Sequence, residues 1–317
     1  MSLRVWLSVV LAFVVGGVAS AATTVPKGKR TPRRPATHVV VRTVDLDAQG
    51  ATLRLAPGVG VSVAGGRADA PLAGRVTATV AGGVEITGRI EGAALGERLT
   101  RTVALRAADG RAPIGTGLEG ALVAVAGKAA DGEAICETTG LVRARVLVPA
   151  DALGAEPHEL VYPMVAERVV WVPAETELLG APGGRPRARL ARGARVAVIA
   201  DDDPKWARVR TYGAFALDGV VAKDRLATDA DGAPPLDEPV PKGLTPTHEV
   251  LAIAAASADA AGRKVVGNLR GGTLVSVGVE VAGPRVKVMT YGDVVGELWV
   301  PSAALRPLER EIWNERD

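Results

Sequence analysis

The sequence of 317 residues has a single cysteine, Cys136, only three histidines, and an aromatic content of 3%. One thiol cannot form an intramolecular disulfide, so the fold must depend on its apolar core. The hydrophobic content of 48% supplies ample material for that core. The scarcity of aromatic side chains argues against extensive sugar-stacking platforms. No glycine-rich phosphate loop precedes a helix, so nucleotide binding has no support.

The sequence also lacks a long hydrophobic run at its start. The apolar stretch at 5–15 has eleven residues, well short of the ~20 that span a bilayer. It follows Arg4 and precedes Ala-Ser-Ala at 19–21, which is the pattern of a signal peptide cleaved before Ala22. We therefore predict export to the periplasm or the extracellular space, with no transmembrane segment in the mature chain. An exported chain with one thiol also suggests a bacterial envelope or secreted protein.

Positive charge is concentrated near the predicted mature N-terminus. The segment 27–34 holds five basic residues, Lys27, Lys29, Arg30, Arg33 and Arg34. Without these and Arg4, 32 basic residues stand against 35 acidic ones, so the rest of the chain is nearly neutral. The basic segment is either a simple leader or a weak, salt-sensitive contact with a polyanion.

Beyond this leader, β-branched residues alternate with polar ones in short runs, and turn residues recur every 8 to 12 positions. This pattern is typical of all-β proteins with small barrels or sandwiches. No long segment has the 3.6-residue period of a helix, so no sizeable helical domain is expected. The segment 229–247 contains five prolines and is predicted to be an extended linker.

The pattern G-x-x-V-x-V occurs four times, and each occurrence begins what we call a copy, numbered 1 to 4. The leading glycines are Gly58, Gly120, Gly193 and Gly272. A second glycine follows 20 residues later in three copies and 24 residues later in the first: Gly82, Gly140, Gly213 and Gly292. A leucine stands thirteen residues further on: Leu95, Leu153, Leu226 and Leu305. A β-branched residue precedes each leucine by five positions: Ile90, Val148, Val221 and Val300.

These recurring residues have a mechanical interpretation. V-x-V places two branched side chains on one face of a strand, and glycine supplies the positive φ that hairpin turns require. The β-branched residue and the leucine are both expected to point inward. The predicted organisation is a signal peptide at 1–21, a leader at 22–37, barrel repeats at 38–97, 98–155, 156–228 and 248–309, the linker at 229–247, and a tail at 310–317.

The copies resemble a known family. WVPSAAL at 299–305 and LVPADAL at 147–153 look like the last strand and closing 3₁₀ turn of the Src-homology-3 (SH3) barrel. The stretch 186–226 is similar to the bacterial form of that family, with Trp206 leading into a strand. The resemblance implies a small five-stranded barrel in each copy. It also implies binding of cell-wall peptides or other envelope components.

The groove that reads proline-rich peptides in eukaryotic relatives is missing its aromatic residues. The closing turn normally contributes a tyrosine, and the corresponding residues here are Ala94, Ala152, Arg225 and Ala304. The aromatic residues that remain are concentrated in the last two copies. The candidate ligand or partner site comprises Trp206, Tyr212, Tyr291 and Trp299. A binding role predicts an exposed ring face on at least one of them, whereas a purely structural array predicts that all four are buried.

Catalytic and metal-binding residues are not apparent. Cys136 aligns with valines of copies 3 and 4, which predicts a buried small hydrophobe and not a reactive thiolate. His38, His158 and His248 each precede a copy and are interpreted as strand-entry residues, with no second histidine at zinc-protease spacing. The acidic run 201–203 lacks calcium-loop spacing and predicts a solvated turn.

We therefore expect a non-enzymatic exported protein without a cofactor. Its predicted role is to bind wall peptides or partner proteins in the bacterial envelope. The alternative is a structural or assembly component whose repeats mainly pack on each other or on a larger complex.

Overall fold

A computed structural model describes residues 35–64, 71–109, 112–157, 168–228 and 244–308. The predicted signal peptide, the basic residues of the leader and His158 lie outside these residues. The fold is all-β, as predicted, with 58% strand and 5% helix, and none of the described residues belongs to a helix of seven residues or more. It includes a small closed barrel of six strands, one more than the resemblance implies.

The strands of the first two copies run from residue 38 to residue 154. Copy 1 contains β1 (His38–Val40), β2 (Val44–Ala48), β3 (Ala51–Leu55), β4 (Gly60–Val63), β5 (Arg75–Val80), β6 (Val84–Glu91) and the 3₁₀ turn η1 (Gly92–Ala94). The strand β7 (Leu95–Leu99) follows. Copy 2 continues with β8 (Val103–Ala107), β9 (Pro113–Gly117), β10 (Leu122–Lys128), β11 (Glu133–Thr138), β12 (Val142–Arg143), β13 (Arg145–Pro149), η2 (Ala150–Ala152) and β14 (Leu153–Gly154).

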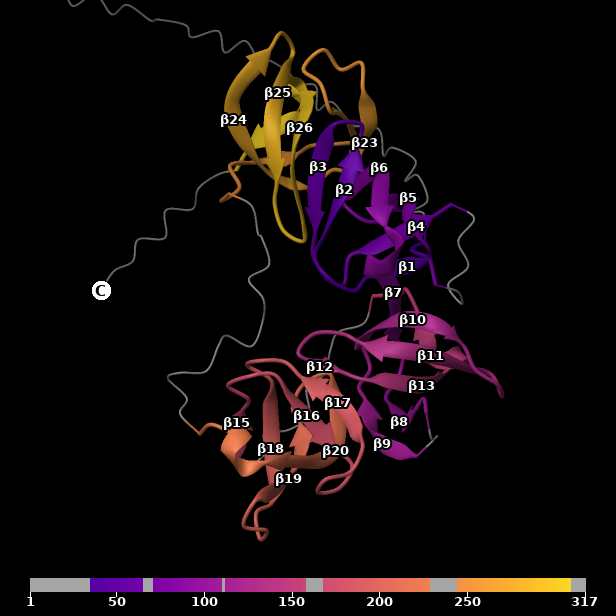
Figure 1. Cartoon of the computed structure of the whole chain (residues 1–317). Coiled ribbons are helices and arrows are strands. Elements are labelled where there is room, and N and C mark those ends of the chain that lie inside the picture. The colour runs from indigo at the N-terminus through magenta and orange to yellow at the C-terminus, as the bar shows by residue number, and fades with distance from the viewer. Residues whose placement is uncertain (1–34, 65–70, 110–111, 158–167, 229–243, 309–317) are drawn as a thin grey trace, which may run out of the picture. The chain divides into compact units, whose positions relative to one another are not determined.

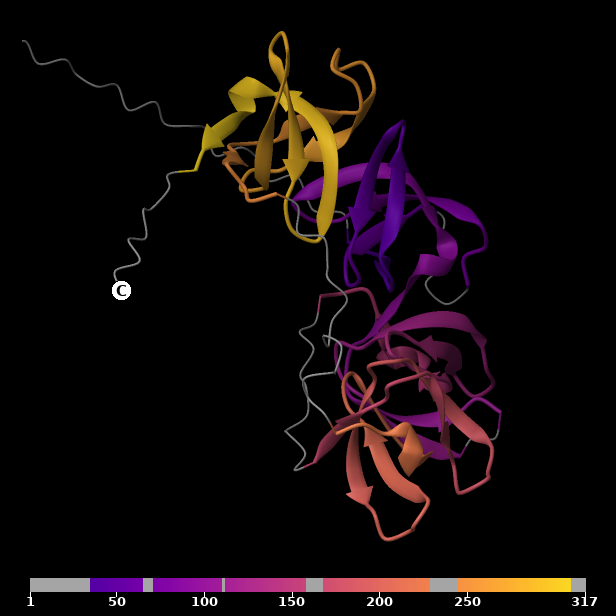
Figure 2. The same ribbon diagram turned by 60° about the vertical axis from the view of Figure 1, so that its left-hand side comes forward.

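The last two copies have the same order of elements. Copy 3 contains β15 (Val169–Trp171), β16 (Thr176–Leu179), β17 (Pro186–Leu190), β18 (Arg195–Ala200), β19 (Trp206–Thr211), β20 (Phe215–Ala222) and η3 (Lys223–Arg225). Copy 4 contains β21 (His248–Val250), β22 (Ala254–Ser257), β23 (Val265–Leu269), β24 (Leu274–Ala282), β25 (Arg285–Thr290), β26 (Val294–Pro301), η4 (Ser302–Ala304) and β27 (Leu305–Pro307). Figures 1 and 2 show from two directions how β24, β25 and β26 curl around one another.

One pattern of antiparallel pairing recurs in all four copies. In copy 4, β21 pairs with β24 and β27, β22 pairs with β23 and β26, and β25 lies between β24 and β26. Copy 1 has the same pairings through β1–β7. Copy 2 has them through β7–β14, and copy 3 through β15–β20 with a closing bridge between Trp171 and Ala227. Membership of the copies in the SH3 family stays a prediction.

The recurring glycines and β-branched residues have the geometry that was expected of them. All eight repeated glycines have positive φ, from +78° at Gly140 to +137° at Gly82. The four β-branched residues are fully buried: Ile90, Val148, Val221 and Val300. The leucines that follow are less uniform, because Leu95 is buried whereas Leu153, Leu226 and Leu305 are only partly buried. The repeated spacing thus corresponds to turns and inward-facing strand positions.

A buried threonine stabilises the hairpin turn in three copies. In copy 4, the hydroxyl of Thr290 donates to the carbonyl of Val294 at 2.7 Å and accepts from the N–H of Gly296 at 3.0 Å. Thr138 and Thr211 make the equivalent pair of bonds in copies 2 and 3. The hydroxyl satisfies two backbone groups that the turn would otherwise leave unpaired in the core.

The copies pair with one another, copy 1 with copy 4 (the 1·4 pair) and copy 2 with copy 3 (the 2·3 pair). Each pair is joined by two antiparallel strand contacts: β3 with β26 and β23 with β6 in the first, β9 with β20 and β17 with β12 in the second. The second glycine of each copy lies in its hairpin turn, and we call it the turn glycine. At every contact, the residue three positions before the leading glycine of one copy faces the residue two positions after the turn glycine of the partner copy. These are Leu55 and Val294, Leu269 and Val84, Gly117 and Phe215, and Leu190 and Val142. The contacts are therefore reciprocal, as in a two-fold dimer.

Size complementarity accompanies this register. Two residues further along each contact, a large side chain faces a glycine in three cases: Leu53 with Gly296, Ile86 with Gly267, and Leu217 with Gly115. A Cβ atom on Gly267 would lie 2.0 Å from the carbonyl oxygen of Glu85, and one on Gly115 would lie 2.1 Å from that of Ala216. The two backbones therefore approach more closely than any side chain at these glycines would allow.

The buried residues form two clusters that follow the pairs. One cluster draws its members from copies 1 and 4, and the other from copies 2 and 3. The strand β7 crosses the predicted boundary at 97/98, because Leu95 and Gly96 pair with β1 while Glu97 and Arg98 pair with β10. One strand thus contributes to the first copy and opens the second.

Candidate functional site

Each pair of copies has a concave space of about 400 Å³ next to its hairpin turns. The 2·3 cleft is lined by Thr139, Gly140, Leu141, Val142, Ala194, Arg195, Tyr212, Gly213, Ala214 and Phe215. The 1·4 cleft is lined by Gly58, Val59, Gly60, Val80, Ala81, Gly83, Val84, Thr273, Leu274, Tyr291, Asp293 and Val294. Both clefts lie where the turn of one copy approaches the turn of its partner, so they occupy equivalent places.

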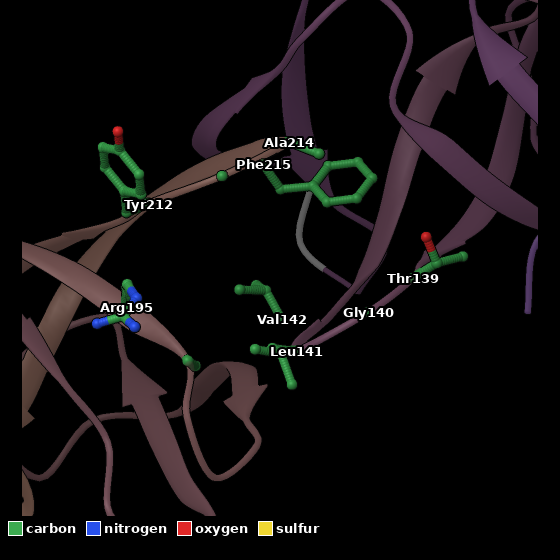
Figure 3. Close-up of a pocket in the computed structure, with 10 residues that line it drawn as sticks. Thr139, Gly140, Leu141, Val142, Arg195, Tyr212, Ala214 and Phe215 are labelled. Carbon is green, nitrogen blue, oxygen red and sulfur yellow. The ribbon is translucent and has the colours of Figure 1, made fainter. Parts of the chain in front are cut away.

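The 2·3 cleft combines an apolar floor with a few polar groups. Val142 and Phe215 are buried there, and Leu141 is partly exposed. In Figure 3, Tyr212 and Arg195 stand on one side of the cleft, with Leu141 and Val142 facing them from copy 2. A concave, mainly apolar surface with a few convergent polar groups is the usual form of a small-ligand site.

The tyrosines are positioned by the same backbone contact in both late copies. The N–H of Tyr212 donates to the carbonyl of Arg195 at 2.8 Å, and the N–H of Tyr291 donates to that of Leu274 at 3.2 Å. Each tyrosine directly precedes the turn glycine, whose positive φ turns the chain away and leaves the ring at the rim of the cleft. Tyr291 is 37% exposed, and Tyr212 is partly exposed.

The 1·4 cleft has a different lining. Its charged member is Asp293, an exposed carboxylate directly after the turn glycine of copy 4. In the same cleft, the hydroxyl of Thr273 donates to the carbonyl of Gly83 at 3.0 Å, which joins the two copies. Arg270 and Glu85 form an ion pair of 2.5 Å at the same junction. Their charges offset each other, so Asp293 dominates the charge of the cleft wall.

The four predicted aromatic residues do not form one site. Tyr212 and Tyr291 line separate clefts, while the two tryptophans line neither. Trp206 begins β19, and its N–H donates to Asp203 Oδ1 at 3.0 Å. Trp299 lies within β26, where its carbonyl accepts from Arg285 at 2.7 Å. None of the four is fully buried.

Sequence reasoning missed the residues that complete each cleft. Arg195 and Asp293 were not singled out, and neither was Leu141, which comes from the partner copy. The shared T-Y-G of copies 3 and 4 was a usable signal for the tyrosines. The partner contributions had no comparable signal, because they depend on which copies pair.

The other candidate residues have structural roles. Cys136 is fully buried between Val125 and Val146, and burial, with a smaller contribution from Glu97, raises the pKa of its thiol to about 12. His38 and His248 are the first residues of β1 and β21, and each Nδ1 lies 2.9 Å from the hydroxyl of the preceding threonine. Both were predicted as strand-entry residues.

The acidic run at 201–203 is engaged within its own copy. Asp201 forms ion pairs with Lys223 at 2.5 Å and Arg168 at 2.8 Å. Asp203 Oδ1 accepts from the N–H groups of Lys205 and Trp206, and these bonds lower the pKa of the carboxylate. In the part of the chain that the structure describes, no three His, Cys, Asp or Glu side chains are grouped so that they could hold a metal ion.

No protein-family model matches the chain, and no curated protein is significantly similar to it. Among the described residues, no helix has the length and apolar character needed to cross a bilayer. The fold and the clefts define an all-β protein in which small curled sheets associate in pairs, with one cleft in each pair.

Proposed function

We propose that this chain is a non-catalytic exported binding or scaffold protein of the bacterial cell envelope. Its ligands are wall peptides or partner proteins, which it holds in the 2·3 and 1·4 clefts. The single observation that carries this proposal is the placement of Tyr212 and Tyr291 at the rims of two equivalent concave spaces. A tyrosine with an exposed ring face beside an apolar hollow is a frequent anchor of protein and peptide contacts.

The chemistry of the clefts favours binding over catalysis. The thiol of Cys136 is buried with its pKa raised to about 12, so it is neither accessible nor ionised at neutral pH. The 2·3 cleft presents one guanidinium, one phenol and one threonine hydroxyl among apolar groups. Such a set can orient a peptide segment, but it offers no nucleophile with an adjacent base.

The proposal of export rests on the sequence at 1–21, which has the pattern of a signal peptide. The mature protein would then reach the periplasm or the outside of the cell. The basic residues Lys27, Lys29, Arg30, Arg33 and Arg34 would follow the cleavage site. We assign them a weak, salt-sensitive contact with anionic wall polymer or lipid headgroups.

A second candidate function is supported by the pairing of the copies. Each pair is joined by two strand contacts and a shared apolar cluster, so each copy already uses two strands to bind another copy of the same chain. This arrangement suits a structural or assembly component of a larger complex. It differs from the first proposal in requiring no ligand in either cleft.

A pull-down of the mature protein with purified sacculi separates the two. We expect binding by the wild type, a loss of about tenfold or more in affinity for Tyr212→Ala or Tyr291→Ala, and little change for Tyr212→Phe and Tyr291→Phe, which keep the rings. Unchanged binding by both alanine variants would show that the clefts are not the site. Absence of binding to sacculi and to envelope extract would favour the assembly role.

A further inference from the structure

The two clefts differ in charge although they occupy equivalent places. Two residues after the leading glycine, copy 3 has Arg195 and copy 4 has Leu274. One residue after the turn glycine, copy 3 has Ala214 and copy 4 has Asp293. All four residues line their clefts. The 2·3 cleft thus has a cation where the 1·4 cleft has an aliphatic group, and the 1·4 cleft has an anion where the 2·3 cleft has a methyl group.

Among the lining residues that the structure describes, Arg195 is the one charged group of the 2·3 cleft and Asp293 that of the 1·4 cleft. Arg195 is partly buried and faces the apolar groups of Leu141 and Val142 across the 2·3 cleft (Figure 3). In a hollow with apolar walls, fewer waters compete for the guanidinium, so a carboxylate beside it is attracted more strongly than at an open surface. The neighbouring Tyr212 ring offers an apolar face to the group that carries the carboxylate.

The 1·4 cleft has the opposite preference. Asp293 lies two residues after Tyr291, and a carboxylate beside an aromatic ring suits an ammonium group through ion pairing and cation–π attraction. Two arginines outside the lining contact other groups of this pair. Arg270 pairs with Glu85, and Arg98 Nη2 donates at 3.1 Å to the carbonyl of Gly58, a lining residue.

We propose that the two clefts select ligand groups of opposite charge: the 2·3 cleft binds a carboxylate attached to an apolar group, and the 1·4 cleft binds an ammonium attached to an apolar group. This inference rests on the proposed function, because it assigns ligand chemistry to the clefts that the function uses. A peptide carries both kinds of group, in its termini and in its side chains. The clefts therefore read different parts of a peptidic ligand.

The chain is suited to a direct test because it has only three tyrosines, Tyr162, Tyr212 and Tyr291. Labelling with 3-fluorotyrosine gives three ¹⁹F resonances, which single Tyr→Phe variants assign. Benzoate and benzylamine have similar shapes and opposite charges at pH 7, and benzyl alcohol is the neutral probe. We expect benzoate to move the Tyr212 resonance and benzylamine to move that of Tyr291, with little crossover.

Charge-neutralising variants complete the test. Arg195→Gln is expected to weaken benzoate binding about tenfold and to leave benzylamine unaffected, and Asp293→Asn is expected to do the reverse. Arg192→Gln and Asp224→Asn remove exposed charges that do not line the clefts, so they should change neither titration.

The outcomes separate this inference from the proposed function. If all three probes move both resonances equally, the clefts bind ligands without charge selection, and only the inference is refuted. If charge selection occurs but survives Arg195→Gln and Asp293→Asn, the assignment to these residues is refuted. If no probe moves either resonance at millimolar concentration, while the wild type binds sacculi, the clefts are not the ligand site and both proposals fail.

Discussion

Replacing Gly267 with alanine should disrupt the contact between β23 of copy 4 and β6 of copy 1. The new Cβ would lie 2.0 Å from the carbonyl oxygen of Glu85, whereas ordinary Cβ contacts begin at 3.4 Å. Strands β23 and β6 must therefore move apart by about 1.4 Å, the difference between these distances. The contact between them comprises only three residue pairs, so a shift of this size disrupts most of it.

The expected cost has three sources, the first being the φ of +157° at Gly267, which an L side chain rarely adopts. Overpacking against a backbone atom costs about 1–3 kcal/mol, and each weakened hydrogen bond of the strand contact adds about 1 kcal/mol. We expect a total of about 2–4 kcal/mol. The matched control is Gly127→Ala in β10, where a Cβ would meet no atom within 4 Å and φ is not positive. That change should be neutral or slightly stabilising, by up to about 1 kcal/mol.

Hydrogen exchange read by mass spectrometry is the appropriate assay, together with thermal unfolding. Peptides that cover β6 and β23 should lose protection in Gly267→Ala, while peptides that cover β12 and β17 in the 2·3 pair should keep it. Equal protection in Gly267→Ala and Gly127→Ala would refute the argument from close backbone approach. Loss of protection in both pairs together would show that they do not unfold independently.

Three further predictions concern single side chains. Thr290→Val should destabilise copy 4 by about 1–3 kcal/mol, measured by urea unfolding, because the N–H of Gly296 loses its buried acceptor. Cys136 should react with a thiol reagent only as fast as the protein unfolds, since the thiol is fully buried with a pKa of about 12; rapid labelling under native conditions would contradict this. The lowered pKa of Asp203 means that its bonds hold at neutral pH and weaken only as the pH falls through that pKa, which lies below the ordinary value of 3.8. The amide resonance of Trp206 should report this transition, and Asp203→Asn should abolish it, because an amide side chain does not titrate in that range.

The predicted binding residues were a partial guide to the clefts. Tyr212 and Tyr291 line them, as their matching positions before the turn glycines suggested. Trp206 and Trp299 were grouped with them on aromatic character alone, and they lie elsewhere on strands β19 and β26. Proximity in space could not be read from residue type, because the tryptophans occupy different strands of their copies.

The sizes of the facing side chains explain why copy 1 does not pair with copy 3 and copy 2 does not pair with copy 4. Pairing copy 1 with copy 3 would set Leu53 against Leu217, two large side chains at a close backbone approach. Pairing copy 2 with copy 4 would set Gly115 against Gly296 and leave a void. The observed 1·4 and 2·3 pairs avoid both conflicts. In three of their contacts a large residue faces a glycine, and in the fourth the equivalent positions are held by Ala144 and Ala188.

Local pattern alone determined the β-strands, the turns and the inward positions of this protein. Alternation with period two requires one buried face, and glycine permits the positive φ found at all eight repeated positions. The pairing of the copies, the shared strand β7 and the two clefts were decided only by tertiary structure. These features arise where segments far apart in the sequence meet, as Glu85 and Arg270 do in their ion pair. The fit between such segments depends on the size of the side chains at the contact and not on any local sequence period.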